Sequence, residues 1–167
     1  GFDTGPANML MDAWCQQHTG KSYDANGDWA AAGQVDATLL QRLLAHPYFS
    51  RSAPKSTGRE TFGAAWLNAQ LASEQRAISA INVQATLAEL TAISVCDAIK
   101  QTCQGLSGEL LVCGGGANNR YLMARLQAHL AHWQVASTAS KGIDPQWIEA
   151  LAFAWLARQM VSGLPGN

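Results

Sequence analysis

The segment ELLVCGGGANN at residues 109–119 constrains the fold more than any other part of this sequence. Residues 109–113 are largely apolar and are bounded by glycines, which predicts a strand buried on both faces. Three consecutive glycines follow, and apolar positions at helical spacing then predict a helix over about 118–131. A glycine turn between a buried strand and a helix is typical of the ligand-binding edge of an α/β fold.

Apolar positions at helical spacing dominate the rest of the chain, and strand-like segments are few. Asp36 and Asn82 are predicted N-caps, and the Asp144-Pro145 pair predicts the start of the last helix. The sequence therefore predicts one α/β domain that is mostly helical by residue count. Helices are predicted over about 6–17, 36–46, 60–71, 82–104 and 145–161, strands at Phe2 and 134–137, and loop-rich insertions at about 20–35 and 48–58.

The composition of the 167 residues excludes several classes of protein. With 48% hydrophobic and 14% charged residues, the chain has the balance of a globular domain rather than of a disordered segment. A net charge of −1 leaves no broad basic surface for nucleic acid or for an anionic membrane, and no apolar run approaches the roughly 20 residues of a membrane span. Cys96 and Cys103 lie about 10.5 Å apart along the predicted helix, too far for a disulfide, which favours a reducing cytoplasm.

The glycine triplet is the first candidate site. Glycines at the end of a strand let the backbone approach a ligand closely, and the next helix directs free N–H groups at it. The spacing is neither GxGxxG nor GxxxxGK[ST], so it supports neither a dinucleotide site nor a Walker-type phosphate loop. A nucleotide site and a simple tight turn both remain open at this point.

The segment Asp3-Thr4-Gly5 is the second candidate, because it places a carboxylate and a hydroxyl where a strand gives way to a helix. A carboxylate there can take a proton from water or a hydroxyl while nearby amides face an anion, an arrangement suited to phosphoryl transfer. The alternative is an aspartate that only caps the helix.

Glu149 is the third candidate, because the helix around it is apolar on nearly all sides. Such a helix is predicted to be buried, and a buried carboxylate requires either a structural partner or a functional role. Lys55 and Arg59 lie in a loop that could hold an anion, but a solvated loop is the more common explanation of such residues. His129 and His132 share a helix face with no third ligand nearby in sequence, and no metal site is predicted.

Five stretches, in this order and with similar spacing, resemble the anhydro-N-acetylmuramic acid kinases. They are GFDTGPANMLMDAW from Gly1, PKSTGRETF from Pro54, VQATLAELTA from Val83, LLVCGGGANNRYLM from Leu110 and IEALAFAWLA from Ile148. Because these separate motifs are spread over nearly the whole chain, the match is far more specific than one glycine run.

The resemblance implies a member of the superfamily of actin, hexokinase and the heat-shock ATPases, with two ribonuclease H-like lobes closing on ATP and Mg²⁺. Residues 1–167 would form most of the second lobe, with the N-terminal lobe and the first strands of this lobe missing. The family enzyme opens the 1,6-anhydro ring of its sugar substrate with water and phosphorylates O6 to give N-acetylmuramic acid 6-phosphate. It recycles cell-wall sugar in the bacterial cytoplasm, and the resemblance suggests a homodimer.

The resemblance also implies roles for individual residues. Asp3 would be the general base that activates water, and Thr4 and Gly5 would contact the sugar. Glu149 would help to hold the water and the sugar. The residues implied to lie against the adenosine are Gly114, Gly115, Gly116, Asn118 and Asn119.

Two departures from the family pattern stand out. Ala7 occupies a position where the family usually has glycine, and the family's glycine-rich phosphate loops have no counterpart here. We therefore interpret the chain as a fragment that is catalytically silent alone. Rival interpretations are another sugar kinase of the same superfamily, a non-catalytic nucleotide-binding or scaffold lobe, and a helical interaction module.

Overall fold

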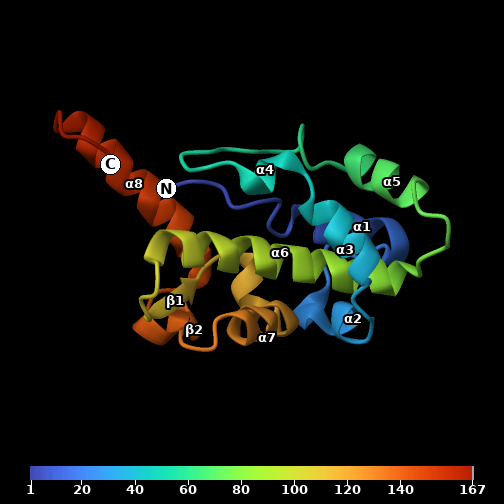
Figure 1. The fold of residues 1–167 in the computed structure, drawn as a ribbon. Coiled ribbons are helices and arrows are strands. Elements are labelled where there is room, and N and C mark those ends of the chain that lie inside the picture. The colour runs from blue at the N-terminus through green and yellow to red at the C-terminus, as the bar shows by residue number, and fades with distance from the viewer. Residues whose placement is uncertain (167) are drawn as a thin grey trace.

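The computed structural model describes residues 1–166 and shows a mixed α/β chain in which helices predominate (Figure 1). The α-helices are α1 (Met9–Thr19), α2 (Asp28–Ala31), α3 (Ala37–Leu44), α4 (Pro47–Ser50), α5 (Ala64–Ala72), α6 (Ala80–Cys103), α7 (Arg120–His129) and α8 (Ile148–Val161). The strands are β1 (Glu109–Val112) and β2 (Gln134–Ser137). The short 3₁₀ helices are η1 (Ala25–Gly27), η2 (Gly115–Asn118), η3 (Thr138–Lys141) and η4 (Pro145–Trp147).

Helix α6 is the centre of the fold, and α1, α2, α3 and α7 all pack against it. Every residue from Val83 to Ala92 is buried, which is possible because these helices surround it on several sides. The predicted N-cap Asn82 is wrong, since the helix begins after Ser79. The Asn82 side chain is engaged elsewhere: its Oδ1 accepts a hydrogen bond of 2.9 Å from the backbone N–H of Gln34.

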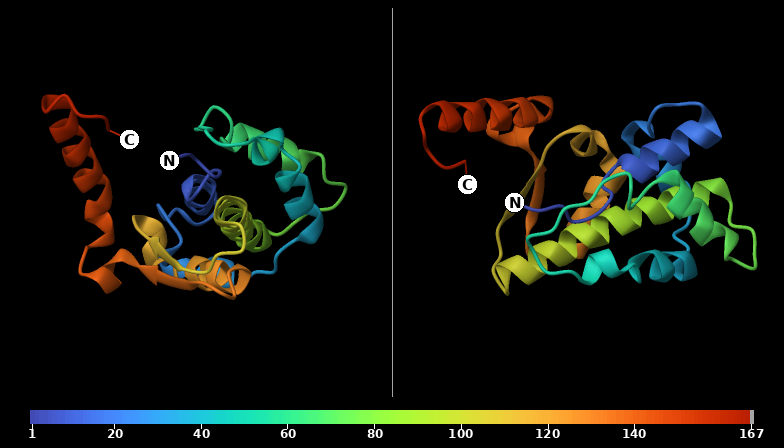
Figure 2. Two further views of the ribbon diagram at one scale, coloured as in Figure 1. Left: turned by 60° about the vertical axis from the view of Figure 1, so that its left-hand side comes forward. Right: turned by 90° about the horizontal axis from the view of Figure 1, so that it is seen from above.

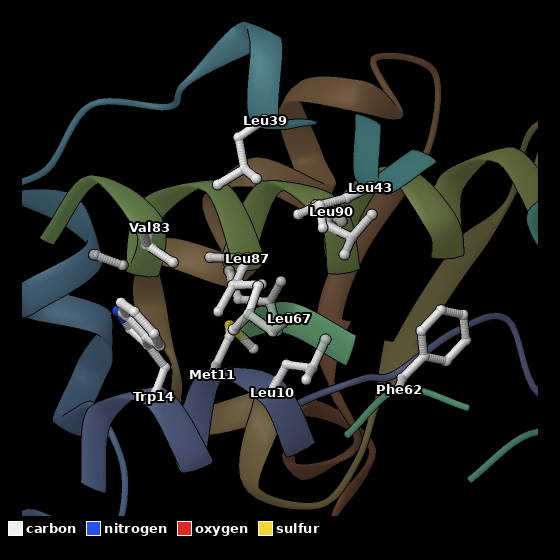
Figure 3. Packing of buried hydrophobic residues seen from close by; sticks show 14 of the residues in the cluster. Leu10, Met11, Trp14, Leu39, Leu43, Phe62, Leu67, Val83, Leu87 and Leu90 are labelled. Atoms are coloured by element: carbon white, nitrogen blue, oxygen red, sulfur yellow. The ribbon is translucent and has the colours of Figure 1, made fainter. Parts of the chain in front are cut away.

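The hydrophobic core fills the space between α6 and the helices on either side of it (Figure 3). Leu10 and Trp14 of α1 face α6 from one side, and Leu39 of α3 lies on the other. The indole Nε1 of Trp14 donates a 2.8 Å hydrogen bond to the carbonyl of Ala80, so this large ring is buried without leaving its polar atom unpaired. These contacts hold the amino-terminal segment of the chain against the central helix.

Strands β1 and β2 pair in parallel, with Glu109 opposite Gln134 and Val112 opposite Ser137. Helix α7 makes the crossover between them and packs against β2. The prediction that the first strand is buried on both faces is wrong, because its residues alternate between exposed and half-buried and Leu111 is 39% exposed. Within residues 1–166 the sheet has no further strand.

Both segments predicted to be loop-rich contain helical turns. In the first, Asp24 Oδ1 and Oδ2 accept hydrogen bonds from the backbone N–H groups of Trp29 and Ala30, which fixes the start of α2. Ala30 is fully buried against the core. In the second, α4 carries the buried ring of Tyr48. Local hydrogen bonds and single buried side chains order these segments, rather than a long run of apolar residues at helical spacing.

Helix α8 projects away from the rest of the chain (Figure 2). The prediction of a buried helix, and with it a buried Glu149, is wrong: no residue of α8 is buried, and Phe153 and Trp155 are 64% and 48% exposed. The helix does form over the predicted range, after Asp144 caps η4 by accepting from the backbone N–H of Gln146. Among the described helices, none is both long enough and apolar enough to cross a membrane.

Candidate functional site

Asp3 lies in an extended segment rather than at the end of a strand, so the strand predicted at Phe2 does not form in the described chain. Its backbone is nevertheless fixed from both sides. The Asp3 N–H donates to the carbonyl of Lys55 at 3.1 Å, and the buried Tyr48 hydroxyl donates to the Asp3 carbonyl at 2.7 Å. The loop at residues 51–58 thus takes the positioning role that a neighbouring strand would have had.

The same loop holds the Asp3 carboxylate. Oδ2 accepts hydrogen bonds from Ser56 Oγ at 2.9 Å and from the backbone N–H of Thr57 at 3.0 Å. The alternative that Asp3 caps the first helix is wrong, because α1 begins after Asn8 with no side-chain cap. Within residues 1–166, Oδ1 has no hydrogen-bond partner, and the side chain is exposed. One carboxylate oxygen is therefore oriented by the protein, and the other remains available to an incoming proton donor.

Lys55 belongs to the packing of this loop. Its Nζ lies 3.3 Å from the carbonyl oxygen of Tyr48 and 3.4 Å from that of Phe49, and it sits 4.9 Å from the centre of the Tyr48 ring. These contacts make Lys55 a link between α4 and the loop that carries Ser56. Thr4, predicted to contact the sugar, lines a cavity of about 230 Å³ together with Lys55 and residues of the second half of α6.

Gly5 and Ala7 carry the chain from Asp3 to helix α1. A Cβ atom on Gly5 would lie 3.0 Å from the ring of Phe49 and 3.1 Å from Ser94 Oγ, so the absence of a side chain lets this segment lie close to α6. Ala7 has a φ of 49°, a left-handed conformation that disfavours any residue other than glycine. Thr91 Oγ1 donates to the Ala7 carbonyl at 2.9 Å and holds it there.

The glycine turn lies against the start of α1. Gly114 requires glycine for its own conformation, with φ 69° and ψ −165°. Gly115 and Gly116 do not: neither has a left-handed φ, and a Cβ on either would meet nothing closer than 3.5 Å. The side chain of Asn8 is near both positions, and the side chain of Leu122 is equally close to position 116. Packing within the chain therefore leaves room for a Cβ atom at positions 115 and 116, so close packing alone does not explain these two glycines.

An open cavity of about 440 Å³ lies between the glycine turn, the first turn of α1 and residues 23–26. Three of the residues predicted to contact a nucleotide line it, namely Gly115, Asn118 and Asn119. Asn119 also caps α7, since its Oδ1 accepts from the backbone N–H of Leu122 at 2.9 Å. The predicted start of this helix at Asn118 or Asn119 is confirmed to within a residue.

Asp12 and Tyr23 also line this cavity and were not among the candidate residues. Burial raises the pKa of the Asp12 carboxyl above its usual value, and the nearby negative charge of Asp24 raises it further. Asp12 lies within the first stretch that resembles the kinase family, but its position there does not mark it as a ligand, and Tyr23 lies outside all five stretches. They come to line the same cavity as the glycine turn through the packing of α1 and α2 on α6 and α7, which no local pattern in the sequence predicts.

A buried ionic cluster joins α7 to α6. Glu89 is 5% exposed and accepts from Arg125 Nε at 2.6 Å and Nη2 at 2.8 Å, and His129 Nε2 lies 2.7 Å from Glu89 Oε1. Burial raises the pKa of the Glu89 carboxyl, but the hydrogen bonds from Arg125 and His129 outweigh it and leave the pKa lowered. The cluster fixes α7 and, through it, the glycine turn. Within residues 1–166, no three His, Cys, Asp or Glu side chains gather at metal-binding distance.

The model of the family described as anhydro-N-acetylmuramic acid kinase matches residues 1–167, the whole chain. The chain belongs to the anhydro-N-acetylmuramic acid kinase family. A member from Thiobacillus denitrificans is 56% identical over 167 residues, covering 100% of this chain and 45% of that relative. Members from Psychrobacter cryohalolentis and Pasteurella multocida are 54% and 53% identical, and 40% and 44% of their lengths are covered. The chain thus spans less than half the length of these kinases.

Two residues that the anhydro-N-acetylmuramic acid kinase pattern singles out, Glu149 and Ala7, lie in contrasting surroundings. Glu149 lies on the exposed helix α8, and within residues 1–166 its carboxylate makes no hydrogen bond, with the Asp3 segment or with any other. Ala7, which departs from the glycine expected in this family, adopts the left-handed conformation that explains why glycine suits the position.

Proposed function

We propose that this chain supplies the water-activating carboxylate and the nucleoside-facing half of a kinase. That kinase opens the 1,6-anhydro ring of anhydro-N-acetylmuramic acid with water and phosphorylates O6. The observation that carries the proposal is the state of Asp3: its backbone and one carboxylate oxygen are fixed by Lys55, Ser56 and Thr57, and the other oxygen is unengaged. Fixing a base while leaving one oxygen open is what general-base catalysis requires.

In the proposed reaction, Asp3 Oδ1 takes a proton from water. The water oxygen bonds to the anomeric carbon, the bond between that carbon and O6 breaks, and its electron pair stays on O6. O6 then bonds to the γ-phosphorus of ATP as ADP leaves, so the sugar gains a hydroxyl group at the anomeric carbon and a phosphoryl group at O6. The proton held by Asp3 passes to solvent. The hydrogen bonds from Ser56 and Thr57 keep Oδ2 occupied and orient Oδ1 in one direction.

The glycine turn fits a nucleotide. Gly115 and Gly116 each have room for a Cβ atom that they lack, and Gly115 borders a cavity large enough for a nucleoside. ATP would supply the phosphoryl group there, and Mg²⁺ would offset the charge on its phosphates. The backbone of residues 114–116, with Asn118 and Asn119, would lie against the adenosine.

We further propose that residues 1–167 form most of one ribonuclease H-like lobe of a two-lobed kinase that works in the bacterial cytoplasm. The parallel β1–β2 pair would be extended by strands from the rest of the polypeptide. Other parts of that polypeptide would also pack on the sheet, since parallel sheets are normally covered on both faces. Glu149 would join the sugar site once the rest of the enzyme packs on the apolar surface of α8. Its proposed role is to hold the attacking water and the sugar.

The test uses a full-length family kinase that carries these 167 residues. With ATP and anhydro-N-acetylmuramic acid, mass spectrometry should show ADP and a product carrying the added water and phosphoryl group. Ordinary hexoses in parallel reactions should give no product. Turnover of hexoses instead would indicate a different sugar kinase, whereas ATP binding without turnover of any sugar would indicate a non-catalytic lobe.

A further inference from the structure

The cavity beside the glycine turn is unusual in its charge. Two carboxylates, Asp12 and Asp24, line it, and no lysine, arginine or histidine does. A triphosphate carries several negative charges and would be repelled by such walls. If ATP binds here, as the proposed function requires, the part of ATP that enters this cavity is therefore the uncharged one, the base and the ribose.

The two carboxylates differ in what they can still bind. Both oxygens of Asp24 are occupied by the backbone N–H groups of Trp29 and Ala30, at 2.9 and 2.8 Å. Asp12 is half-buried, and its carboxylate accepts no hydrogen bond from any donor in residues 1–166. Keeping a carboxylate partly out of water without a donor is costly, and its raised pKa reflects that cost. A ligand that donates a hydrogen bond would relieve it.

Tyr23 gives the same cavity an aromatic wall. It is 63% exposed although it lines the cavity, and within residues 1–166 its hydroxyl has no hydrogen-bond partner. The buried turn at Asp24 follows it directly and fixes its backbone. A flat side chain held open beside a cavity is the usual platform for a nucleobase, and such stacking contributes about 1–3 kcal/mol per base.

We propose that Asp12 accepts a hydrogen bond from the nucleoside of ATP and that Tyr23 stacks on its base. The triphosphate then leaves the cavity past Gly115, which has no side chain to obstruct it. This inference rests on the proposed function and adds two residues that recognise the nucleotide. The donor to Asp12 is either the 6-amino group of adenine or a ribose hydroxyl, and both present the same chemistry to the carboxylate.

The experiment measures kcat and KM for ATP in the full-length kinase and in the variants Asp12→Asn, Tyr23→Ala and Tyr23→Phe. Removing the charged acceptor should raise KM roughly tenfold or more, because hydrogen bonds to charged groups are among the strongest. Tyr23→Ala should raise KM as well, and Tyr23→Phe should not, since it keeps the ring. In all three variants kcat should change little. Asp28→Asn is the matched control: Asp28 is an exposed aspartate outside the cavity, paired with Arg120 at 3.6 Å.

Two further nucleotides identify the donor. If the 6-amino group donates, inosine triphosphate should bind the wild-type enzyme more weakly than ATP, and Asp12→Asn should abolish the difference. If a ribose hydroxyl donates, the 2′- or 3′-deoxy analogue of ATP should instead bind the wild-type enzyme more weakly than ATP, and Asp12→Asn should abolish that difference. Thermal unfolding without ligand checks the fold, and Asp12→Asn should be at least as stable as the wild type because the lost charge was unfavourable.

The possible failures are distinguishable. Wild-type KM values in both Asp12→Asn and Tyr23→Ala, in an enzyme that turns over, would overturn this inference and leave the proposed function standing. A wild-type enzyme that neither binds ATP nor phosphorylates the sugar would overturn both. A rise in KM for Asp28→Asn equal to that for Asp12→Asn would also overturn the inference, because the effect would then be one of overall charge.

Discussion

Replacing Gly115 by alanine should make the protein more stable and a poorer binder of ATP. The stability effect follows from the surroundings of position 115. The added Cβ would lie 3.6 Å from Asn8 Nδ2, an ordinary contact, and Gly115 does not have a left-handed φ. A glycine-to-alanine change at such a position stabilises by about 0.4–1 kcal/mol, chiefly by restricting the unfolded chain. For a domain of this size that raises Tm by roughly 1–4 °C.

The binding effect has the opposite sign. If the backbone of Gly115 touches the nucleotide, the new methyl group occupies space that the ligand needs. Overpacking of this kind costs about 1–3 kcal/mol, which corresponds to roughly a 5- to 150-fold weaker affinity for ATP. A gain in stability together with a loss of affinity is the signature of a residue selected for binding rather than for folding.

The assay combines ligand-free thermal unfolding with titration of ATP, both in the full-length kinase. Gly20→Ala is the control, because Gly20 ends α1 with φ 75° and lies outside the cavity. That change should lower Tm and leave ATP affinity unaltered. A Gly115→Ala variant that loses stability would refute the packing argument, and unchanged ATP affinity would refute the nucleotide site at the glycine turn.

Two further changes test the scaffold around the site. Glu89→Gln should cost about 2–3 kcal/mol of unfolding free energy, because it removes the buried charge that faces Arg125 and His129 and turns one of the two acceptor oxygens into an NH₂ donor. Partial exposure of Arg125 moderates the loss. The pKa of Glu89 is lower in the folded protein than its unfolded value of 4.5, so the ionised cluster stabilises the fold at pH values above 4.5. That stabilisation is lost as the pH falls through the folded-state pKa. The denaturant midpoints of wild type and variant should therefore converge in acid. Ala7→Gly should raise stability by about 0.5–1 kcal/mol by relieving the left-handed alanine; a lower midpoint in urea would contradict the conformation described for Ala7.

Elements with a local start signal and an apolar stripe were predictable from the sequence. Asp36 caps α3 as predicted, through a 3.0 Å hydrogen bond from the backbone N–H of Leu39, and β2 forms over the predicted residues. The start of α6 was not predictable from the cap residue, because Asn82 is of a type that favours N-caps. A contact with Gln34, far away in the chain, engages Asn82, and α6 begins after Ser79, whose side chain makes no capping hydrogen bond.

The site itself was predictable only in part. The glycine turn and Asp3 could be singled out from the sequence, because a glycine run after a strand and a carboxylate before a helix are both patterns that occur at ligand sites. Asp12 and Tyr23 do not, because they reach the cavity through the packing of four helices. The burial of Glu149 was wrong for a related reason: an apolar helix indicates that some surface covers it, and none among residues 1–166 does.

The most direct test of the account is the turnover number of Asp3→Asn in the full-length kinase, measured with saturating ATP and anhydro-N-acetylmuramic acid. Asparagine can still accept the hydrogen bonds from Ser56 and Thr57, but it cannot take a proton from water. The account expects kcat to fall by roughly 10²- to 10⁴-fold while ATP affinity is unchanged. A variant that turns over at the wild-type rate would contradict the assignment of Asp3 as the base.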